Sequence, residues 1–422
     1  MTENGDNSPA LDMIMAKLDR EPQDPLHAAV VLEAFAGRTP SESMNEVARL
    51  SESMPSSGKG PTPTPTGSRL DLKEFLVLIT VLASVFVWLP FLRDLLGDDL
   101  APTVAWALPA ALACDRALMI RYFASGELRT ISRAIWWINA ASLTALGLAS
   151  MFGTAAFIGV ALVIVWGQAS MTAMREWPLA YVNVVIASAT WMAAGGDVEI
   201  VLTASALAVI ATNTVAVISS DSKERVPDSA WITLAAAVIG ASAGMLLTAD
   251  PHMWRDHQIG LAVAILAVSL SGWWGSVRLT GLWLDLPTRL ASITIDDHAN
   301  RWGGHVVSNA VTGAVMRVLL PTWVLLVVAI ALGEPDAAVL VAAFAMFAVA
   351  MLLLGLVVAT KRWFSAATIS ALATMVALAT PDSLPGLPLL VGSAVEAFGF
   401  AVLALIAFRE SATTFATRML VR

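Results

Sequence analysis

The chain has 422 residues, of which 57% are hydrophobic and 14% charged, and its formal charge is −8. Soluble domains are about 45–50% apolar and about 25% charged, so this composition excludes a soluble enzyme, a disordered protein and a nucleic-acid-binding protein. The single cysteine, Cys114, excludes an intramolecular disulfide framework and a cysteine-rich metal site. Fifteen tryptophans against two tyrosines suit a membrane protein, because indole rings favour the interface.

The first 54 residues are polar, and we predict a small helical cytoplasmic segment there. An apolar helix at 25–37 ends at Gly37, and a second helix is predicted from Ser41 to about Met54. No signal peptide is expected, because the acidic start lacks a basic stretch before an apolar run. Residues 55–72 form a linker rich in Pro, Thr, Gly and Ser. The tail is either a loosely ordered extension or a module that docks a partner.

Long apolar runs separated by short polar loops occupy the rest of the chain, and a run of about 20 apolar residues spans a bilayer. We therefore predict an all-α fold, a polytopic membrane bundle with about twelve transmembrane helices. The join of the third and fourth helices requires a very tight turn at 151–153. The predicted spans are 74–92, 102–120, 134–151, 153–172, 178–195, 199–219, 230–248, 258–277, 305–331, 337–359, 363–380 and 388–408.

Basic residues indicate the orientation, because cytoplasmic loops carry an excess of Lys and Arg. With both termini cytoplasmic, 22 of the 25 basic residues fall on the inner side. Arg93 and Arg255 fall outside, and Arg317 lies within a span. A missed or extra helix would move the later loops to the opposite side and remove this bias. The distribution of basic residues therefore supports twelve spans in the plasma membrane.

Six spans precede the loop at 219–229 and six follow, which predicts two six-helix halves, 73–229 and 230–422. The longest inner connections, about 121–133 and about 278–304, occupy equivalent positions in the two halves. Two halves of the same orientation are typical of transporters. The alternative is that similar basic and tryptophan-containing loops recur at any inner interface.

Arg317 is the sharpest candidate functional residue. It stands about mid-span, where a charge costs roughly 2.5–3.5 kcal/mol or more and usually faces a cavity or a partner. Pro321 removes the helical donor to the carbonyl of residue 317, which favours a kink. One interpretation is a cationic site for phosphate or another anion. The other is that the span begins near Val311 and that Arg317 snorkels toward the cytoplasm.

Glu396, near the middle of the last span, is the second candidate, as an ion-coupling group or as an ion-pair partner of Arg317. Asp115 and Arg116 close the second span, and Arg278 closes the eighth. These inner-face charges either set the topology or form an electropositive vestibule for an anionic head group.

Polar residues in or near the spans are the remaining candidates. Asn309 and Asn183 are predicted as polar groups of a cavity, although amides within spans more often make interhelical hydrogen bonds. The same holds for Asn139, Gln168 and Asn213. The polar stretch 285–302 is too polar to span and is predicted to form an interfacial helix. No metal site, cofactor or enzymatic motif is predicted, since no phosphate-binding Gly-rich loop, GxSxG or HExxH motif occurs.

Three short segments carry a resemblance to a known family. Pro287-Thr-Arg-Leu, a short acidic segment and a span with Arg317 and Leu319-Leu-Pro321 resemble the eight-to-nine connection of polysaccharide flippases. Arg121-Tyr-Phe-Ala-Ser-Gly-Glu-Leu-Arg129 looks like its first-half counterpart, and Lys361-Arg362-Trp363 looks like the basic turn before helix eleven. These flippases belong to the superfamily of multidrug, oligosaccharidyl-lipid and polysaccharide exporters. The resemblance covers roughly 74–422, and the appended tail departs from the family pattern.

The resemblance implies a flippase that moves an anionic lipid-linked oligosaccharide by alternating access. Arg317, with Arg278 and Arg116, would hold the phosphates, and Glu396 or Asp115 would couple the cycle to an ion gradient. One alternative is a small-molecule exporter on the same scaffold. Another is a non-transport scaffold that recruits a cytoplasmic partner through its tail in envelope assembly.

Overall fold

In the computed structural model of the chain, every regular element among the described residues is a helix, as predicted. The described residues are 29, 32–33, 39–53, 92–125, 132–168, 195, 197–218, 230–250, 253–254, 258–291, 297–359 and 362–409. A further apolar helix covers Thr154–Gln168. The labelled elements are α3 (Pro40–Ser53), the 3-10 turn η1 (Gly97–Asp99), α5 (Leu100–Ser125), α6 (Ser132–Ala149), α8 (Val198–Ile218), α9 (Ala230–Leu247), α11 (Gln258–Ala291), α12 (Asp297–Ala331), α13 (Pro335–Ala359), α14 (Trp363–Ala379) and α15 (Leu387–Arg409).

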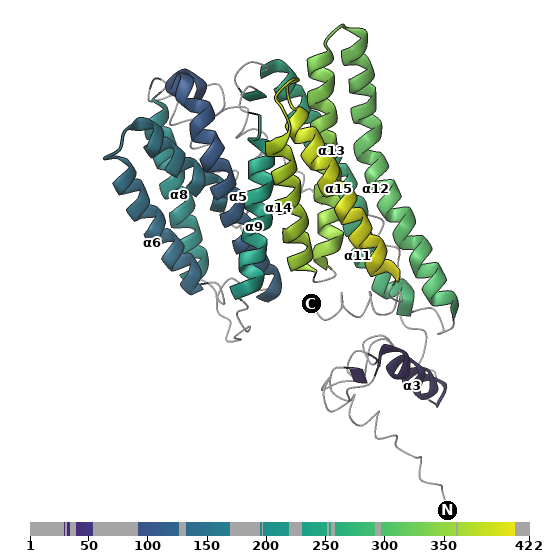
Figure 1. The fold of residues 1–422 in the computed structure, drawn as a ribbon. Coiled ribbons are helices and arrows are strands. Elements are labelled where there is room, and N and C mark those ends of the chain that lie inside the picture. The colour runs from purple at the N-terminus through teal and green to yellow at the C-terminus, as the bar shows by residue number, and fades with distance from the viewer. Residues whose placement is uncertain are drawn as a thin grey trace, which may run out of the picture.

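The long helices stand side by side, and α9 lies at the junction of two groups (Figure 1). On one side α9 packs against α5, which belongs with α6 and α8 to the predicted first half. On its other side α9 packs against α14, beside which lies α15. The remaining helices, α11, α12 and α13, pack against one another, and α13 also packs against α15.

Five of the described helices are long and apolar enough to cross a membrane, which fits a multi-pass membrane protein. Ten of the predicted spans coincide with a described helix, whereas 74–92 and 178–195 lie outside the described residues except for their last residue. The linker at 55–72 also lies outside them. The five membrane-length segments are Val198–Val215, Ala230–Leu247, Ser308–Ala331, Pro335–Val358 and Leu387–Ile406.

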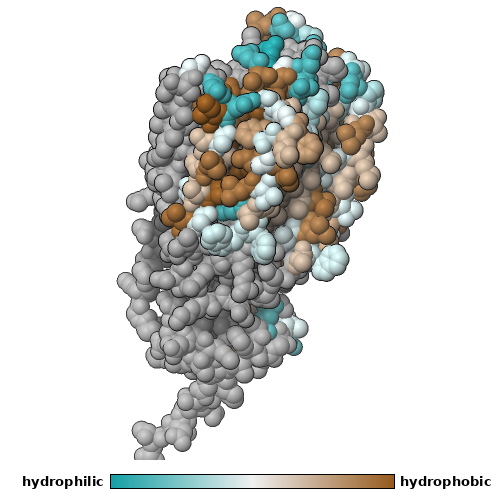
Figure 2. Space-filling model, turned by 90° about the vertical axis from the view of Figure 1, so that its left-hand side faces the viewer, coloured by the Kyte–Doolittle hydropathy of each residue, from teal (hydrophilic) through white to brown (hydrophobic). Residues whose placement is uncertain are grey.

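The surface of these helices carries many exposed apolar side chains, as a lipid-facing surface does. Figure 2 shows brown, hydrophobic residues spread over the described part of one face, with hydrophilic ones gathered toward one end. Tryptophans near the first turns of α6 and α9 are well exposed, namely Trp137 at 77% and Trp231 at 68%. Both positions fall at the predicted cytoplasmic interface, where indole rings are favoured.

The tight turn predicted at 151–153 is present. α6 ends at Ala149, and Gly153 adopts a φ of 103°, which side chains other than glycine rarely adopt. The next helix begins at once, because the amide of Phe157 donates to the carbonyl of Gly153. One glycine thus reverses the chain between two spans, and Met151 and Phe152 at the turn are about 80% exposed.

The structure corrects the predicted long connection at 278–304. α11 runs on to Ala291 and α12 begins at Asp297, so most of the stretch extends two helices beyond their apolar segments. A separate interfacial helix at 285–302 is therefore wrong. Polar residues in the last turns of a helix still form backbone hydrogen bonds, so polarity ends the apolar span without ending the helix.

The helix α12 also passes Pro321 without interruption. The proline removes one backbone donor, and the neighbouring hydroxyl of Thr322 donates to the carbonyls of Val318 and Leu319 at 2.8 and 2.9 Å. A side-chain donor next to the proline adds hydrogen bonds to this part of the helix, as hydroxyls do in membrane helices.

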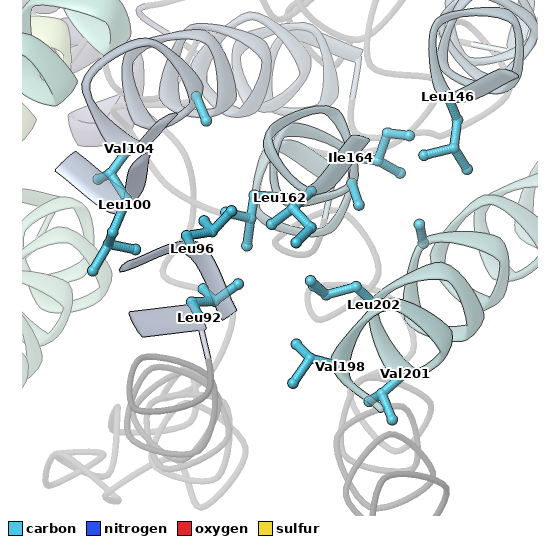
Figure 3. Close-up of a cluster of buried hydrophobic side chains, with 14 of the residues drawn as sticks. Leu92, Leu96, Leu100, Val104, Leu146, Leu162, Ile164, Val198, Val201 and Leu202 are labelled. Carbon is cyan, nitrogen blue, oxygen red and sulfur yellow. The ribbon is translucent and has the colours of Figure 1, made fainter. Parts of the chain in front are cut away.

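One cluster of buried side chains in the first group of helices is purely aliphatic. Leu92 and Leu96, before the start of α5, lie near Leu162, with Leu202 of α8 on the other side (Figure 3). All four are buried. Two further clusters fill the space among α9 and α11–α15.

The contact of α5 with α9 joins the two groups and depends on two glycines spaced four apart. A Cβ atom added to Gly240 would lie 2.1 Å from the carbonyl oxygen of Leu112, and one added to Gly244 would lie 2.4 Å from Cα of Pro109. The backbones therefore touch, which is the packing that small residues four apart permit in membrane helices.

Replacing Gly240 with alanine should destabilise the protein by about 1–3 kcal/mol, because the new methyl group forces α5 away from α9. The measurement is the unfolding midpoint of the full chain in detergent, followed by tryptophan fluorescence. The matched control is Gly355→Ala on α13, where an added Cβ meets nothing within 4 Å. That control should leave the midpoint unchanged or raise it, and equal loss in both variants would contradict the close-packing argument.

Candidate functional site

Arg317 is held against α11 by one residue. Its Nη1 donates to the carbonyl of Trp274 at 3.2 Å, and its guanidinium carbon lies 5.0 Å from the centroid of the Trp274 ring. An arginine over an indole face is a favourable cation–π pair. A guanidinium has five N–H donors, and among the described residues Arg317 makes no other hydrogen bond.

The level of Arg317 along the bundle follows from the packing of α11 on α12. Gly275 of α11 lies opposite Ala314 and Val318, since a Cβ added there would come within 2.9 Å of the Ala314 carbonyl. Trp274 precedes Gly275 on α11, so the residue that binds the guanidinium lies next to the turn of α12 that carries Arg317.

Glu396 is fully buried on α15. Its Oε1 accepts a hydrogen bond from the Ser370 hydroxyl of α14 at 2.6 Å. Its Oε2 is also buried and has no hydrogen-bond partner among the described residues. A buried carboxyl with one unsatisfied oxygen is costly in a low-dielectric interior, so the position is unusual for a purely structural residue.

Arg116 of α5 links the two groups of helices. Its side chain is exposed, yet its Nη2 lies 4.0 Å from the sulfur of Met351 on α13. This contact joins a helix of the first predicted half to one of the second. Asp115, the preceding residue, is half-buried and has interactions of its own.

The predicted ion pair of Arg317 with Glu396 is wrong. Arg317 lies on α12, which packs against α11 and α13, whereas Glu396 contacts α14. Asn309 lies exposed on α12. Arg278 stands on α11 one turn after Trp274, and Asn183 lies outside the described residues. The structure therefore gives Arg317 and Glu396 separate partners, Trp274 on α11 and Ser370 on α14.

The polar residues of the first group make interhelical hydrogen bonds, as predicted. Asn213 of α8 donates to Gln168 at 3.1 Å, and Gln168 donates to Ser142 of α6 at 3.2 Å. Asn139 of α6 donates to Thr214 of α8 at 3.0 Å. Three helices are therefore joined by an amide and hydroxyl network, which explains these residues without a ligand.

Sequence reasoning missed the partners of the charged residues. Trp274 and Ser370 are common residue types in membrane helices, and only packing brings them against Arg317 and Glu396. Asp250 was also missed. It is 2% exposed in the loop after α9, and its Oδ2 accepts from the amide of Gly386 just before α15 at 2.7 Å. The sequence did offer one signal for this residue, namely a carboxylate in a short loop between two apolar helices.

No family model, no curated protein and no solved structure matches the chain.

Replacing Gln168 with leucine should destabilise the first group of helices by about 1–2 kcal/mol, because hydrogen bonds to two other helices are lost at a buried position. The unfolding midpoint of the full chain in detergent measures the effect. The control is Thr144→Val on α6, whose hydroxyl donates at 2.9 Å to the carbonyl of Ala140 on the same helix. A Gln168→Leu midpoint equal to that of the control would refute the network's role.

Proposed function

We propose that the chain is a multi-pass transporter of the plasma membrane that flips an anionic lipid-linked oligosaccharide or polysaccharide precursor by alternating access. About twelve helices form two six-helix halves, and both termini are cytoplasmic. The membrane-length helices, the strong bias of basic residues and the junction of two helix groups at α5 and α9 support this arrangement.

Arg317 carries the proposal. A lipid pyrophosphate needs a strong hydrogen-bond donor within the membrane, because its charge cannot cross hydrocarbon unaided. Arg317 offers a guanidinium near the middle of the apolar segment of α12, held by Trp274 and with donors to spare. Guanidinium and phosphate form charge-assisted, often bidentate hydrogen bonds. α12 is also the least buried of the five membrane-length segments, so a lipid has direct access to it.

Other residues are assigned supporting roles. Arg278 and Arg116 attract and hold the phosphates from the cytoplasmic side, and Asn309 and Asn183 contribute polar groups. An ion gradient drives the cycle through Glu396 or Asp115. The chain performs no chemical reaction on its substrate, and it requires no metal or cofactor.

Replacing Arg317 with glutamine should slow lipid translocation by about tenfold or more, because charged hydrogen bonds contribute about 1.5–3 kcal/mol each. The assay uses vesicles of phosphatidylcholine and phosphatidylglycerol that hold the full chain and a fluorescent polyprenyl-pyrophosphate sugar, with dithionite quenching from outside. Arg317→Lys should retain part of the rate, since a cation remains without the planar fork.

The control is Met316→Ala, which truncates the exposed neighbour of Arg317 and should leave the rate unchanged. A wild-type rate in Arg317→Gln would exclude the flippase. Thiol labelling of Arg317→Cys in a Cys114→Ala background tests access separately. Labelling from both sides supports alternating access, whereas labelling from the cytoplasmic side alone supports the snorkelling interpretation.

The N-terminal helix α3 supports a second function, recruitment of a cytoplasmic partner. Thr39 and Glu42 bond reciprocally at its start: the Thr39 amide donates to Glu42 Oε2 at 2.9 Å, and the Glu42 amide donates to the Thr39 hydroxyl at 3.4 Å. This capping box stabilises the first turn. Met44 and Val47 are about 95% buried, as is Leu32 before the helix, so this part of the tail is folded.

Deleting residues 1–68 separates transport from recruitment. If the chain is a flippase, the truncated protein should still insert and translocate the fluorescent lipid in vesicles at the wild-type rate. Cell-surface glycan export in cells is the parallel measurement. Loss of export with intact translocation in vesicles would assign recruitment to the tail, and loss of translocation itself would contradict a separate docking module.

A further inference from the structure

The exposed side of α11 carries a stripe of apolar side chains that ends at the partner of Arg317. Its members follow one another at intervals of three or four residues, which places them on one side of the helix. Each is between 36% and 44% exposed, and they are Val263, Leu266, Leu270 and Trp274. The guanidinium carbon of Arg317 lies 5.0 Å from the centroid of the Trp274 ring, so a cation stands at one end of this stripe.

A second stripe, on α12, begins at Arg317 itself. Leu320, Val324 and Val328 follow Arg317 at intervals of three and four residues, so they lie on its side of the helix. Their side chains are between 46% and 59% exposed. An exposed apolar stripe therefore leads away from Arg317 on its own helix, as one does on α11.

The two stripes lie next to each other. α11 and α12 pack together, and the contact of Arg317 with Trp274 fixes the level at which both stripes start. From that level both run toward the ends of the two helices that are far from the 291–297 connection. We call the two stripes together the α11–α12 strip.

The exposed surface of α12 changes from polar to apolar at Arg317. Before Arg317, the exposed side chains of the membrane-length segment include Ser308, Asn309 and Thr312. After Arg317, the exposed side chains on its side of the helix are those of the strip. An exposed apolar surface alone is typical of any membrane helix, but here it is joined to a cation and to polar groups at one end. That pattern matches an amphiphile with an anionic head group.

The length of the strip fits one leaflet of a bilayer. At a rise of about 1.5 Å per residue, α12 advances about 17 Å from Arg317 to Val328. Half of a hydrocarbon core about 30 Å thick is about 15 Å. In the predicted orientation the Arg317 end of the strip is the cytoplasmic one. A lipid with its head group at Arg317 and its chain along the strip is therefore oriented as a lipid of the cytoplasmic leaflet.

We propose that the α11–α12 strip binds the hydrocarbon chain of the transported lipid while Arg317 binds its phosphate. This inference rests on the proposed function and adds the route by which the substrate arrives. The lipid is taken sideways from the cytoplasmic leaflet, and its chain stays in the bilayer along the outside of the two helices. Only the polar head group then has to pass through the protein, and no covalent bond forms or breaks.

Photolabelling of the full chain in vesicles tests this contact. The vesicles of phosphatidylcholine and phosphatidylglycerol contain a trace of a polyprenyl-pyrophosphate sugar with a diazirine in its chain, and mass spectrometry locates the label after illumination. The label should fall on the strip several times more often than on α14. That helix is a matched reference, because Leu372 and Met375 are exposed apolar residues on a helix without charged side chains.

Two variants test the two parts of the site. Arg317→Gln should lower labelling of the strip about tenfold, because charge-assisted hydrogen bonds to the phosphate are lost. Leu320→Ser should lower labelling of the α11 part of the strip about threefold, because apolar contact with the chain is lost. Leu372→Ser, at an equally exposed position of α14, is the control and should leave labelling of the strip unchanged. In every sample the labelling of α14 reports whether the variant is folded in the membrane.

Three results would overturn the proposal. The first is equal labelling of the strip and of α14 in the wild type, and the second is labelling of the strip that does not change in Arg317→Gln. The third is equally strong labelling by a phosphatidylglycerol with a diazirine at the same depth, which would assign the strip to bulk anionic phospholipid. Efficient disulfide-linked dimers of Leu320→Cys in a Cys114→Ala background would likewise overturn it, by assigning the strip to a second copy of the chain.

The labelling also separates this proposal from the flippase. Labelling of the strip that requires Arg317, in vesicles where no lipid is translocated, would keep the binding site and exclude the flippase. Translocation that requires Arg317, without preferential labelling of the strip, would keep the flippase and exclude this route for the chain.

Discussion

The contact of α5 with α9 is the constraint on which the rest of the arrangement depends. Within a bilayer there is no hydrophobic force between helices, and close van der Waals packing must replace it. Gly240 and Gly244 bring the two backbones into contact, and α9 in turn carries α14. Because this contact tolerates no added atom, it fixes the position of the first group of helices against the second at this level of the bundle.

Both groups of helices leave some buried polar atoms without a partner. In the first group, Asn213, Gln168 and Ser142 bond across three helices, whereas Oδ1 of Asn139 and the hydroxyl of Ser205 have no partner in the described part of the chain. In the second, Glu396 receives one bond and keeps one unsatisfied oxygen. Glu396 differs from the others because it is ionisable. An uncompensated ionisable group within a membrane bundle indicates a functional role.

Apolar run length was sufficient to predict the helices, because a membrane span needs about 20 apolar residues whatever it packs against. Run length did not predict where α11 ends and α12 begins. The turns there are polar, and hydropathy detects only the apolar part of a helix. The tight turn at 151–153 was predictable from a glycine at the right place. The partners of Arg317 and Glu396 were not, because Trp274 and Ser370 are brought there by helix packing that no local pattern encodes.

The two arginines with described contacts lie on different parts of the bundle. Arg317 lies on α12, whose apolar segment is only 22% buried. Arg116 lies on α5, and its Nη2 stands 4.0 Å from the sulfur of Met351 on α13. Under the proposed function, a head group would meet these two guanidinium groups in turn and not at one place. The helix α13 packs against both α12 and α15, so it is the element that connects Arg317 with Glu396.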